Sequence, residues 1–132
     1  MNPQLLLFVA LGGAIGAVGR FVVMNVVGHI AHTGVPWSTL TVNALGAFIL
    51  GSVIELSALV WSPSPEIRAM VVVGMLDAFT TFSAFSMDLY FLLNRGAIVN
   101  ASLYAVGSVL VCLVAFWGGL SLLRILLPVG GA

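Results

Sequence analysis

The chain of 132 residues is 61% hydrophobic and only 6% charged, and its mean hydropathy is +1.23, which excludes an ordinary soluble domain with about 25% charged residues. Its net charge of zero excludes the basic surface that a nucleic-acid partner requires. A transmembrane helix needs about 20 apolar residues, so the chain has room for about four or five crossings and for no soluble catalytic domain; we expect no enzyme activity. Apolar runs predict one all-α membrane domain, residues 1–132, with spans at about 5–27, 40–60, 69–93 and 98–127.

The first predicted span carries small residues three and four positions apart between Gly12 and Gly19. Small residues at this spacing let membrane helices approach closely, so we interpret them as a packing face. Arg20 is different, because an arginine inside a span must face protein or water unless it reaches the membrane surface. Two interpretations are therefore open for Arg20: an anion-attracting vestibule, or a side chain that extends to the interface.

The second predicted span opens after a loop that contains glycine, proline and an interfacial tryptophan. Thr39 and Asn43 are four residues apart and therefore share one helical face. The amide group of Asn43 offers two N–H donors, which suits an anion. The same group can equally form a hydrogen bond between helices, so both interpretations remain open.

The third predicted span places five hydroxyl or carboxyl side chains between Asp77 and Ser86 in its centre. We predict that this helix is broken at Gly74 and residues 77–81, because freed backbone groups are tolerated in a membrane only where they line a cavity or bind an ion. Carbonyl oxygens at a break suit a small hard cation, whereas the amides of the following half-helix suit an anion. The alternative is a continuous helix whose hydroxyl groups bond back to its own carbonyls.

Phe82 and Phe85 lie three residues apart in the second half of this span. Such residues are ordinarily core or lipid-facing aromatics. The edge of a phenyl ring, however, carries the positive part of its quadrupole. Two edges turned inward would therefore attract an anion without a full positive charge.

The fourth predicted span carries Tyr104, Ser108 and Cys112 at successive four-residue steps. This pattern predicts a narrow polar stripe on an otherwise apolar helix. A polar stripe within a membrane faces either a packing partner or a conduction path, and both interpretations are open.

The arginines give almost no preference for one orientation in the membrane. Arg68 and Arg124 flank one side of the four spans, and Arg95 flanks the other. Because loop arginines and lysines set orientation, a difference of two against one predicts insertion in both directions. An antiparallel homodimer would then be the natural assembly. The alternative is that other factors impose a single orientation.

Taken together, these segments resemble the Fluc/CrcB fluoride channels, which are small four-span bacterial membrane proteins. The matching residues are Gly12-Gly13, Gly16-Ala17 and Arg20-Phe21, then Thr39-Leu40, Val42-Asn43 and Gly46, then Gly74, Thr80-Thr81-Phe82-Ser83 and Phe85-Ser86. The resemblance covers nearly the whole chain, and the Thr-Thr-Phe-Ser-x-Phe-Ser run is its most specific part.

The resemblance implies a passive channel that exports cytoplasmic fluoride and so lowers fluoride toxicity, located in the bacterial inner membrane as a multi-pass protein. It implies an antiparallel, dual-topology homodimer with two pores and a central sodium ion that is structural and not transported. The backbone carbonyls of Asp77 and Thr80 would hold that ion, and Asp77 stands where the family usually has glycine. The residues implied at the fluoride pore are Asn43, Phe82, Phe85, Tyr104, Ser108, Thr39 and Arg20.

Two other functions compete with this one. A proton-coupled small multidrug transporter is also a four-span, dual-topology dimer, but it requires a membrane-embedded carboxylate. The first span contains no acid, which leaves Asp77 and Asp88 as the candidates. A non-transporting subunit of a membrane assembly would also be compatible with the polar stripes.

Overall fold

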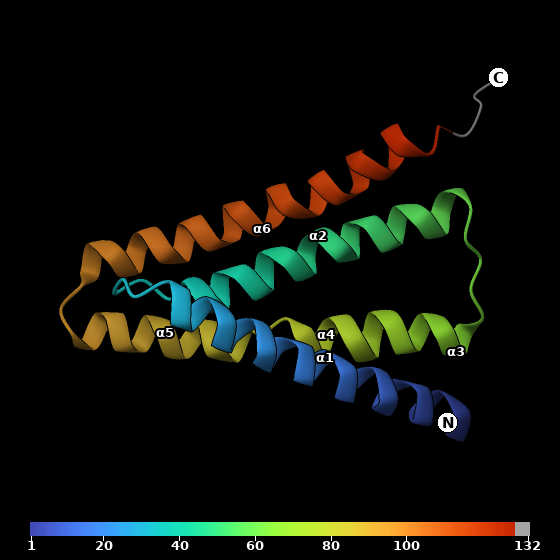
Figure 1. Ribbon diagram of the computed structural model, residues 1–132, viewed down its shortest axis with the longest axis horizontal. Coiled ribbons are helices and arrows are strands. Elements are labelled where there is room, and N and C mark those ends of the chain that lie inside the picture. Colours follow the sequence, from blue (N-terminus) through green and yellow to red (C-terminus); the bar gives the residue numbers. More distant parts are fainter. Residues whose placement is uncertain (129–132) are drawn as a thin grey trace.

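The computed structural model describes residues 1–128, and helices are its only regular secondary structure over that range (Figure 1). Its elements are α1 (Pro3–Ile30), α2 (Trp37–Leu59), α3 (Pro65–Arg68), η1 (Ala69–Leu76), α4 (Asp77–Phe79), α5 (Phe82–Asn94) and α6 (Ile98–Leu126). The elements α3, η1, α4 and α5 follow one another as a single membrane-length unit, so that four helical units are long and apolar enough to cross a membrane. The predicted all-α, four-span fold with a broken third span is confirmed.

The ends of the helices follow from local sequence. The side chains of Asn2 and Ser64 cap α1 and α3, each followed directly by a proline, which suits the first helical position because it lacks the N–H that would be unpaired there. The α5–α6 turn is made by Gly96, whose φ of 74° is accessible to glycine without strain. One boundary differs from the predicted loop: α1 continues to Ile30, so that Gly28 and His29 belong to its last turn.

The four units are arranged with α1 and α6 on opposite flanks, and α2 and the third span between them (Figure 1). Helix α1 packs mainly on η1, and α2 mainly on α6. A methyl group added at Gly12 or Gly16 would overlap the carbonyl oxygen of Met70 or Met75. This confirms the predicted packing face of α1 at Gly12 and Gly16.

Helices α2 and α6 also pack closely through glycines, one on each helix. A methyl group added at Gly51 would overlap the Phe116 carbonyl, and one added at Gly119 would overlap the Phe48 carbonyl. A second cluster near the α5–α6 turn buries Leu92 against α6. The backbones of neighbouring spans therefore lie in direct contact, which fixes the positions of the polar side chains between them.

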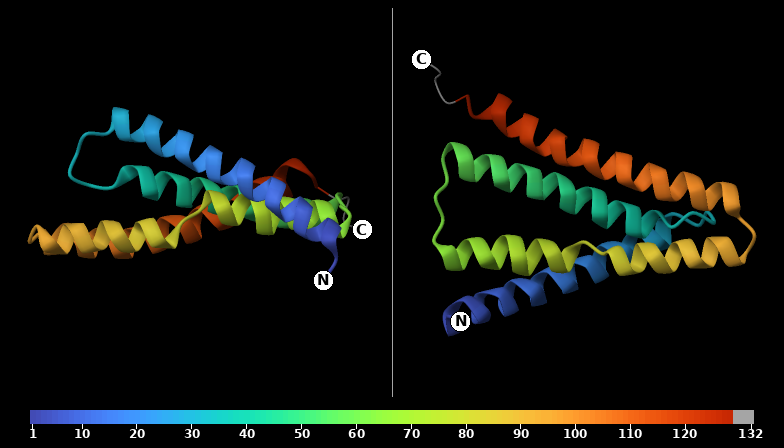
Figure 2. Two further views of the ribbon diagram at one scale, coloured as in Figure 1. Left: turned by 90° about the horizontal axis from the view of Figure 1, so that it is seen from below. Right: turned by 180° about the vertical axis from the view of Figure 1, so that it is seen from behind.

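The start of α1 and the end of α6 lie at the same end of the molecule, as the two further views show (Figure 2). Four crossings require this arrangement. Consequently Arg68 and Arg124 lie toward one end, whereas Arg95 lies at the other, beside the α1–α2 loop. The structure therefore places these arginines on the two sides of the membrane domain that the sequence predicted.

We predict that Gly119→Ala destabilises the protein by about 1–3 kcal/mol, because the added methyl group forces the α2 and α6 backbones apart. Gly107→Ala in the same helix is the matched control, since a methyl group there meets no atom within 4 Å and alanine is favoured in helices by about 1 kcal/mol. Unfolding in detergent micelles measures both variants. Equal stabilities would contradict the close α2–α6 contact.

Candidate functional site

The break in the third span consists of two residues, Thr80 and Thr81, which have extended backbones (φ −80°, ψ 160° and φ −152°, ψ 118°). The span bends by 11° there. The break was predicted at Gly74 and residues 77–81, which is wrong outside residues 80–81. Gly74 is helical within η1 and lies against the backbone of α1, and residues 77–79 form α4. The interruption is thus confined to the point where α4 ends and α5 begins.

Asn43 of α2 holds the break open. The backbone N–H of Thr81 donates to Asn43 Oδ1 at 2.7 Å, and Asn43 Nδ2 donates to the Thr81 carbonyl at 3.0 Å. One side chain therefore satisfies both backbone groups of a residue outside regular helix, as membrane burial requires. Of the two interpretations of Asn43, the bond between helices is observed. The amide carries a second N–H, which this pair does not use.

Two carbonyl groups next to the break lose their usual helical donors. The Asp77 carbonyl would ordinarily accept from the N–H of Thr81, which donates to Asn43 instead. The Thr80 carbonyl would accept from the N–H of Ala84, which donates to Thr81 Oγ1 at 3.1 Å. These oxygens lie at the negative end of a half-helix. The Asp77 side chain is exposed.

A cavity of about 310 Å³ lies on one side of the break. Its lining residues are Asn43, Thr80, Thr81, Phe82, Phe85, Ser108, Val109 and Cys112. Four of the predicted pore residues (Asn43, Phe82, Phe85 and Ser108) therefore come together from three different spans. Ser108 is 7% exposed, and its hydroxyl has no hydrogen-bond partner among the described residues, so it is an unsatisfied donor beside the cavity.

Aromatic rings connect this cavity to the end of α5. The ring centroids of Phe82 and Phe85 are 5.3 Å apart, and those of Phe85 and Tyr104 are 5.2 Å apart. The Tyr104 hydroxyl donates to Asp88 Oδ2 at 3.0 Å. Thr39, only 2% exposed, is buried beside that hydroxyl. The predicted polar stripe of α6 thus faces the other spans.

Arg20 lies on the other side of the break. It is half-buried and lines a second cavity of about 310 Å³ together with Thr81, Ser83 and residues of α1 and α5. Thr81 borders both cavities. Arg20 is therefore not part of the Asn43 cavity, but it places a positive charge across the break from it.

Glu55 was missed by the sequence patterns. It is 6% exposed and accepts from Arg124 Nε at 2.8 Å, which joins α2 to α6. The signal that would have found it is an acid inside the predicted span 40–60 opposite an arginine inside the span 98–127, because a charge within a membrane requires a partner.

The chain matches a family model described as "CrcB-like protein, Camphor Resistance (CrcB)" over residues 7–120. Three similar proteins are each named fluoride-specific ion channel FluC. The protein of Rhodospirillum centenum is 45% identical over 121 residues (92% of this chain, 96% of the relative), that of Hahella chejuensis is 39% identical over 127 residues (96% and 100%), and that of Chelativorans sp. is 44% identical over 122 residues (92% and 98%). Because both kinds of match extend across all four spans, this chain belongs to the CrcB family.

Proposed function

We propose that this multi-pass membrane protein is a passive fluoride channel. The observation that carries the proposal is the cavity beside the break, where Asn43, Phe82, Phe85 and the unpartnered hydroxyl of Ser108 meet. Relatives that align along almost the full length of the chain are named fluoride-specific ion channels. We place the channel in the bacterial inner membrane, where it would let cytoplasmic fluoride leave down its gradient.

The cavity suits a small, strongly hydrated anion because its donors are numerous and weak. An amide N–H, a hydroxyl group and ring edges each replace part of a hydration shell without trapping the ion by a full charge. Helix α5 begins at Phe82, so the N–H groups of its first turn lie at the break. Fluoride would exchange between several such partners, whereas the larger chloride ion would not fit the same donor spacing.

The multidrug-transporter alternative lacks an available carboxylate in the candidate site. Glu55 is paired with Arg124, and Asp88 accepts from Tyr104. Asp77 is an acid beside the break, but its side chain is exposed and does not line the Asn43 cavity. A non-transporting role is distinguished by ion flux from purified protein in liposomes: fluoride efflux without chloride efflux supports the channel, and no efflux of either anion refutes it.

A structural sodium ion fits the carbonyls of Asp77 and Thr80. Both oxygens have lost their helical donors to Asn43 and Thr81, and hard cations prefer oxygen ligands. The ion would supply a positive charge at the negative end of the half-helix that α4 completes. Two carbonyls are too few for full coordination, so the remaining oxygens must come from water or from a second copy of the chain.

We propose that the second copy is antiparallel, in a dual-topology homodimer surrounded by lipid. Phe82 lines the cavity yet is 77% exposed in the single chain, and the exposed carboxylate of Asp77 lies at the middle of a span. Both features call for protein or water at this face, because lipid cannot solvate a carboxylate. The balanced arginines at the two ends favour insertion in both orientations.

The ring-edge hypothesis predicts that Phe82→Ile and Phe85→Ile each abolish fluoride efflux from liposomes while the protein still elutes as a folded species. Isoleucine keeps the bulk and apolarity but removes the quadrupole. Phe48→Ile is the matched control, because the Phe48 ring of α2 lies against Gly118 of α6, and the change should cost about 1–2 kcal/mol of stability and leave flux intact. Near wild-type flux from both site variants would show that these rings serve packing only.

The sodium proposal predicts greater stability in sodium chloride than in the chloride salt of N-methylglucamine, a large organic cation. An ion that binds only the folded assembly stabilises it by about 2.7 kcal/mol at a concentration of 100 times its dissociation constant. Thermal unfolding of purified protein in the two salts measures the difference. Identical unfolding temperatures over a wide salt range would count against a sodium site.

The dual-topology proposal predicts that adding arginines to one end blocks function. His29→Arg and His32→Arg together bias the end that carries Arg95 toward the cytoplasm, and Ser62→Arg with Glu66→Arg produce the opposite bias. Each double variant alone should lose fluoride resistance in cells, and co-expression of the two should restore it. Full activity of one biased variant alone would refute the antiparallel assembly.

A further inference from the structure

The two arginines at the ends of the last two membrane spans are held in different ways. Arg124 donates to the carboxylate of Glu55, and this is the single salt bridge within residues 1–128. Arg95, at the opposite end, donates from Nη2 to the backbone carbonyl of Gly34 at 3.2 Å. A carbonyl group is uncharged, so the positive charge of Arg95 is not neutralised by this contact.

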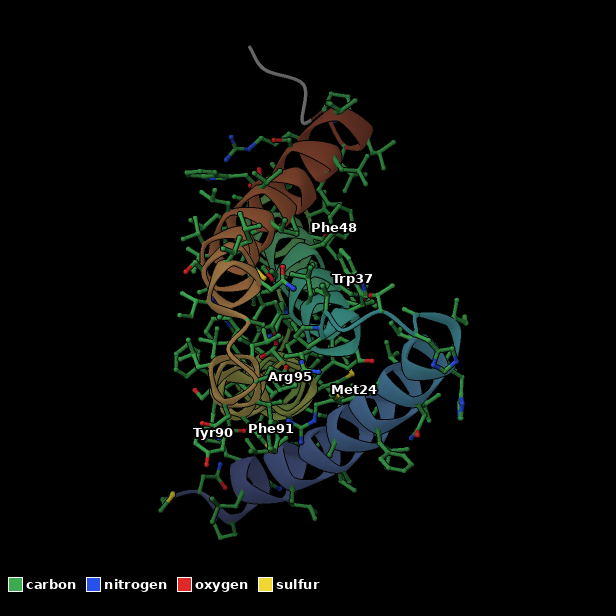
Figure 3. The ribbon with its side chains drawn as sticks, turned by 90° about the vertical axis from the view of Figure 1, so that its left-hand side faces the viewer. Met24, Trp37, Phe48, Tyr90, Phe91 and Arg95 are labelled. Atoms are coloured by element: carbon green, nitrogen blue, oxygen red, sulfur yellow. The ribbon has the colours of Figure 1, made fainter. Side chains whose placement is uncertain are left out.

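Arg95 stands at the rim of a separate cavity of about 430 Å³. One wall is the α1–α2 loop at residues 34–36, and the other is formed by Asp88, Phe91, Leu92 and Arg95. Figure 3 views the molecule from this end, with Arg95 and Phe91 close together. Since a water molecule occupies about 30 Å³, the cavity has room for an ion with its hydration shell.

Side-chain contacts that begin at Asp88 link this cavity to the candidate site, although the two cavities share no lining residue. Asp88 lies seven residues before Arg95 on the α5 side, which corresponds to about 10 Å along the helix axis. Its carboxylate accepts from Tyr104, whose ring packs on Phe85. The residues in contact, from Asp88 through Tyr104 to Phe85, thus run from this cavity to the rings that border the Asn43 cavity.

The order of the two charges matters for an anion. Without Arg95, the only charged residue lining this cavity would be Asp88, and its carboxylate would repel an approaching anion. With Arg95 at the rim, the anion first meets a positive charge, and the two charges offset each other within the cavity. The Gly34 contact holds the guanidinium at that position.

We propose that this cavity is an aqueous mouth of the conduction path and that Arg95 is the residue that draws fluoride into it by offsetting Asp88. In this proposal, the charge of Arg95 attracts the ion before the ion reaches the neutral donors of the Asn43 cavity. The inference rests on the proposed fluoride conduction, and it adds a site on the side of Tyr104 opposite the Asn43 cavity.

The test compares Arg95→Gln, Arg95→Lys and the control Arg68→Gln in liposome fluoride efflux. Arg68 is exposed near the other end and does not line the cavity. Efflux is measured at about 10 mM and about 1 M ionic strength, adjusted with potassium gluconate, because these conditions change the screening length from about 30 Å to about 3 Å.

We expect Arg95→Gln to lower efflux about two- to tenfold at low ionic strength and to approach wild-type efflux at high ionic strength, since the effect is electrostatic. Arg95→Lys should retain most of the efflux, because it keeps the charge. Arg68→Gln should match the wild type at both ionic strengths.

Three results would overturn the proposal for Arg95: wild-type efflux from Arg95→Gln at low ionic strength, an equal loss in the Gln and Lys variants at every ionic strength, or an equal loss in Arg68→Gln. The second would show that Arg95 only ties the α5–α6 turn to the α1–α2 loop. Failure of the wild type to carry fluoride would instead refute the proposed function itself.

Discussion

The pair of hydrogen bonds between Asn43 and Thr81 is the interaction on which the centre of this protein depends. An unsatisfied backbone group in a bilayer costs several kcal/mol, so two extended residues within a span persist only where a partner replaces the helical bonds. Asn43 replaces both bonds of Thr81 from a neighbouring helix. The displaced donors leave the carbonyls of Asp77 and Thr80 available, and a second helix begins at Phe82. Asn43 frees the Asp77 carbonyl, whereas the Thr81 hydroxyl frees the Thr80 carbonyl by capping α5.

Close backbone contacts keep that side chain in register. Glycines bring α1 onto η1 and α2 onto α6 without intervening side chains, so the spans cannot slide without steric overlap. The wider turns of η1 place the carbonyls of Met70 and Met75 toward Gly12 and Gly16. The position of Asn43 relative to the break is thus set by packing on both flanks and not by the hydrogen bonds alone.

The distribution of charge suits the passage of an anion. Neutral donors and phenyl rings line the cavity beside the break, whereas full charges stand at a distance: Arg20 across the break, and Asp88 and Arg95 toward the end of α5. A full positive charge in the cavity would hold an anion too tightly for conduction. In the one salt bridge within residues 1–128, Glu55 and Arg124 neutralise each other between α2 and α6, and this pair serves packing.

Composition and periodicity alone determined the membrane class, the four spans and the broken third span, because each depends on the cost of placing polar groups in hydrocarbon, which any window of sequence reveals. They also identified Asn43, Ser108 and the small residues of α1 as exceptional. Only the tertiary structure decided that the break is confined to Thr80 and Thr81, that Gly74 is a packing residue, that Asn43 bonds to Thr81, and that Glu55 pairs with Arg124. Each of these depends on contacts between residues far apart in the chain, and the periodicity of one span carries no information about which residue of another span lies opposite.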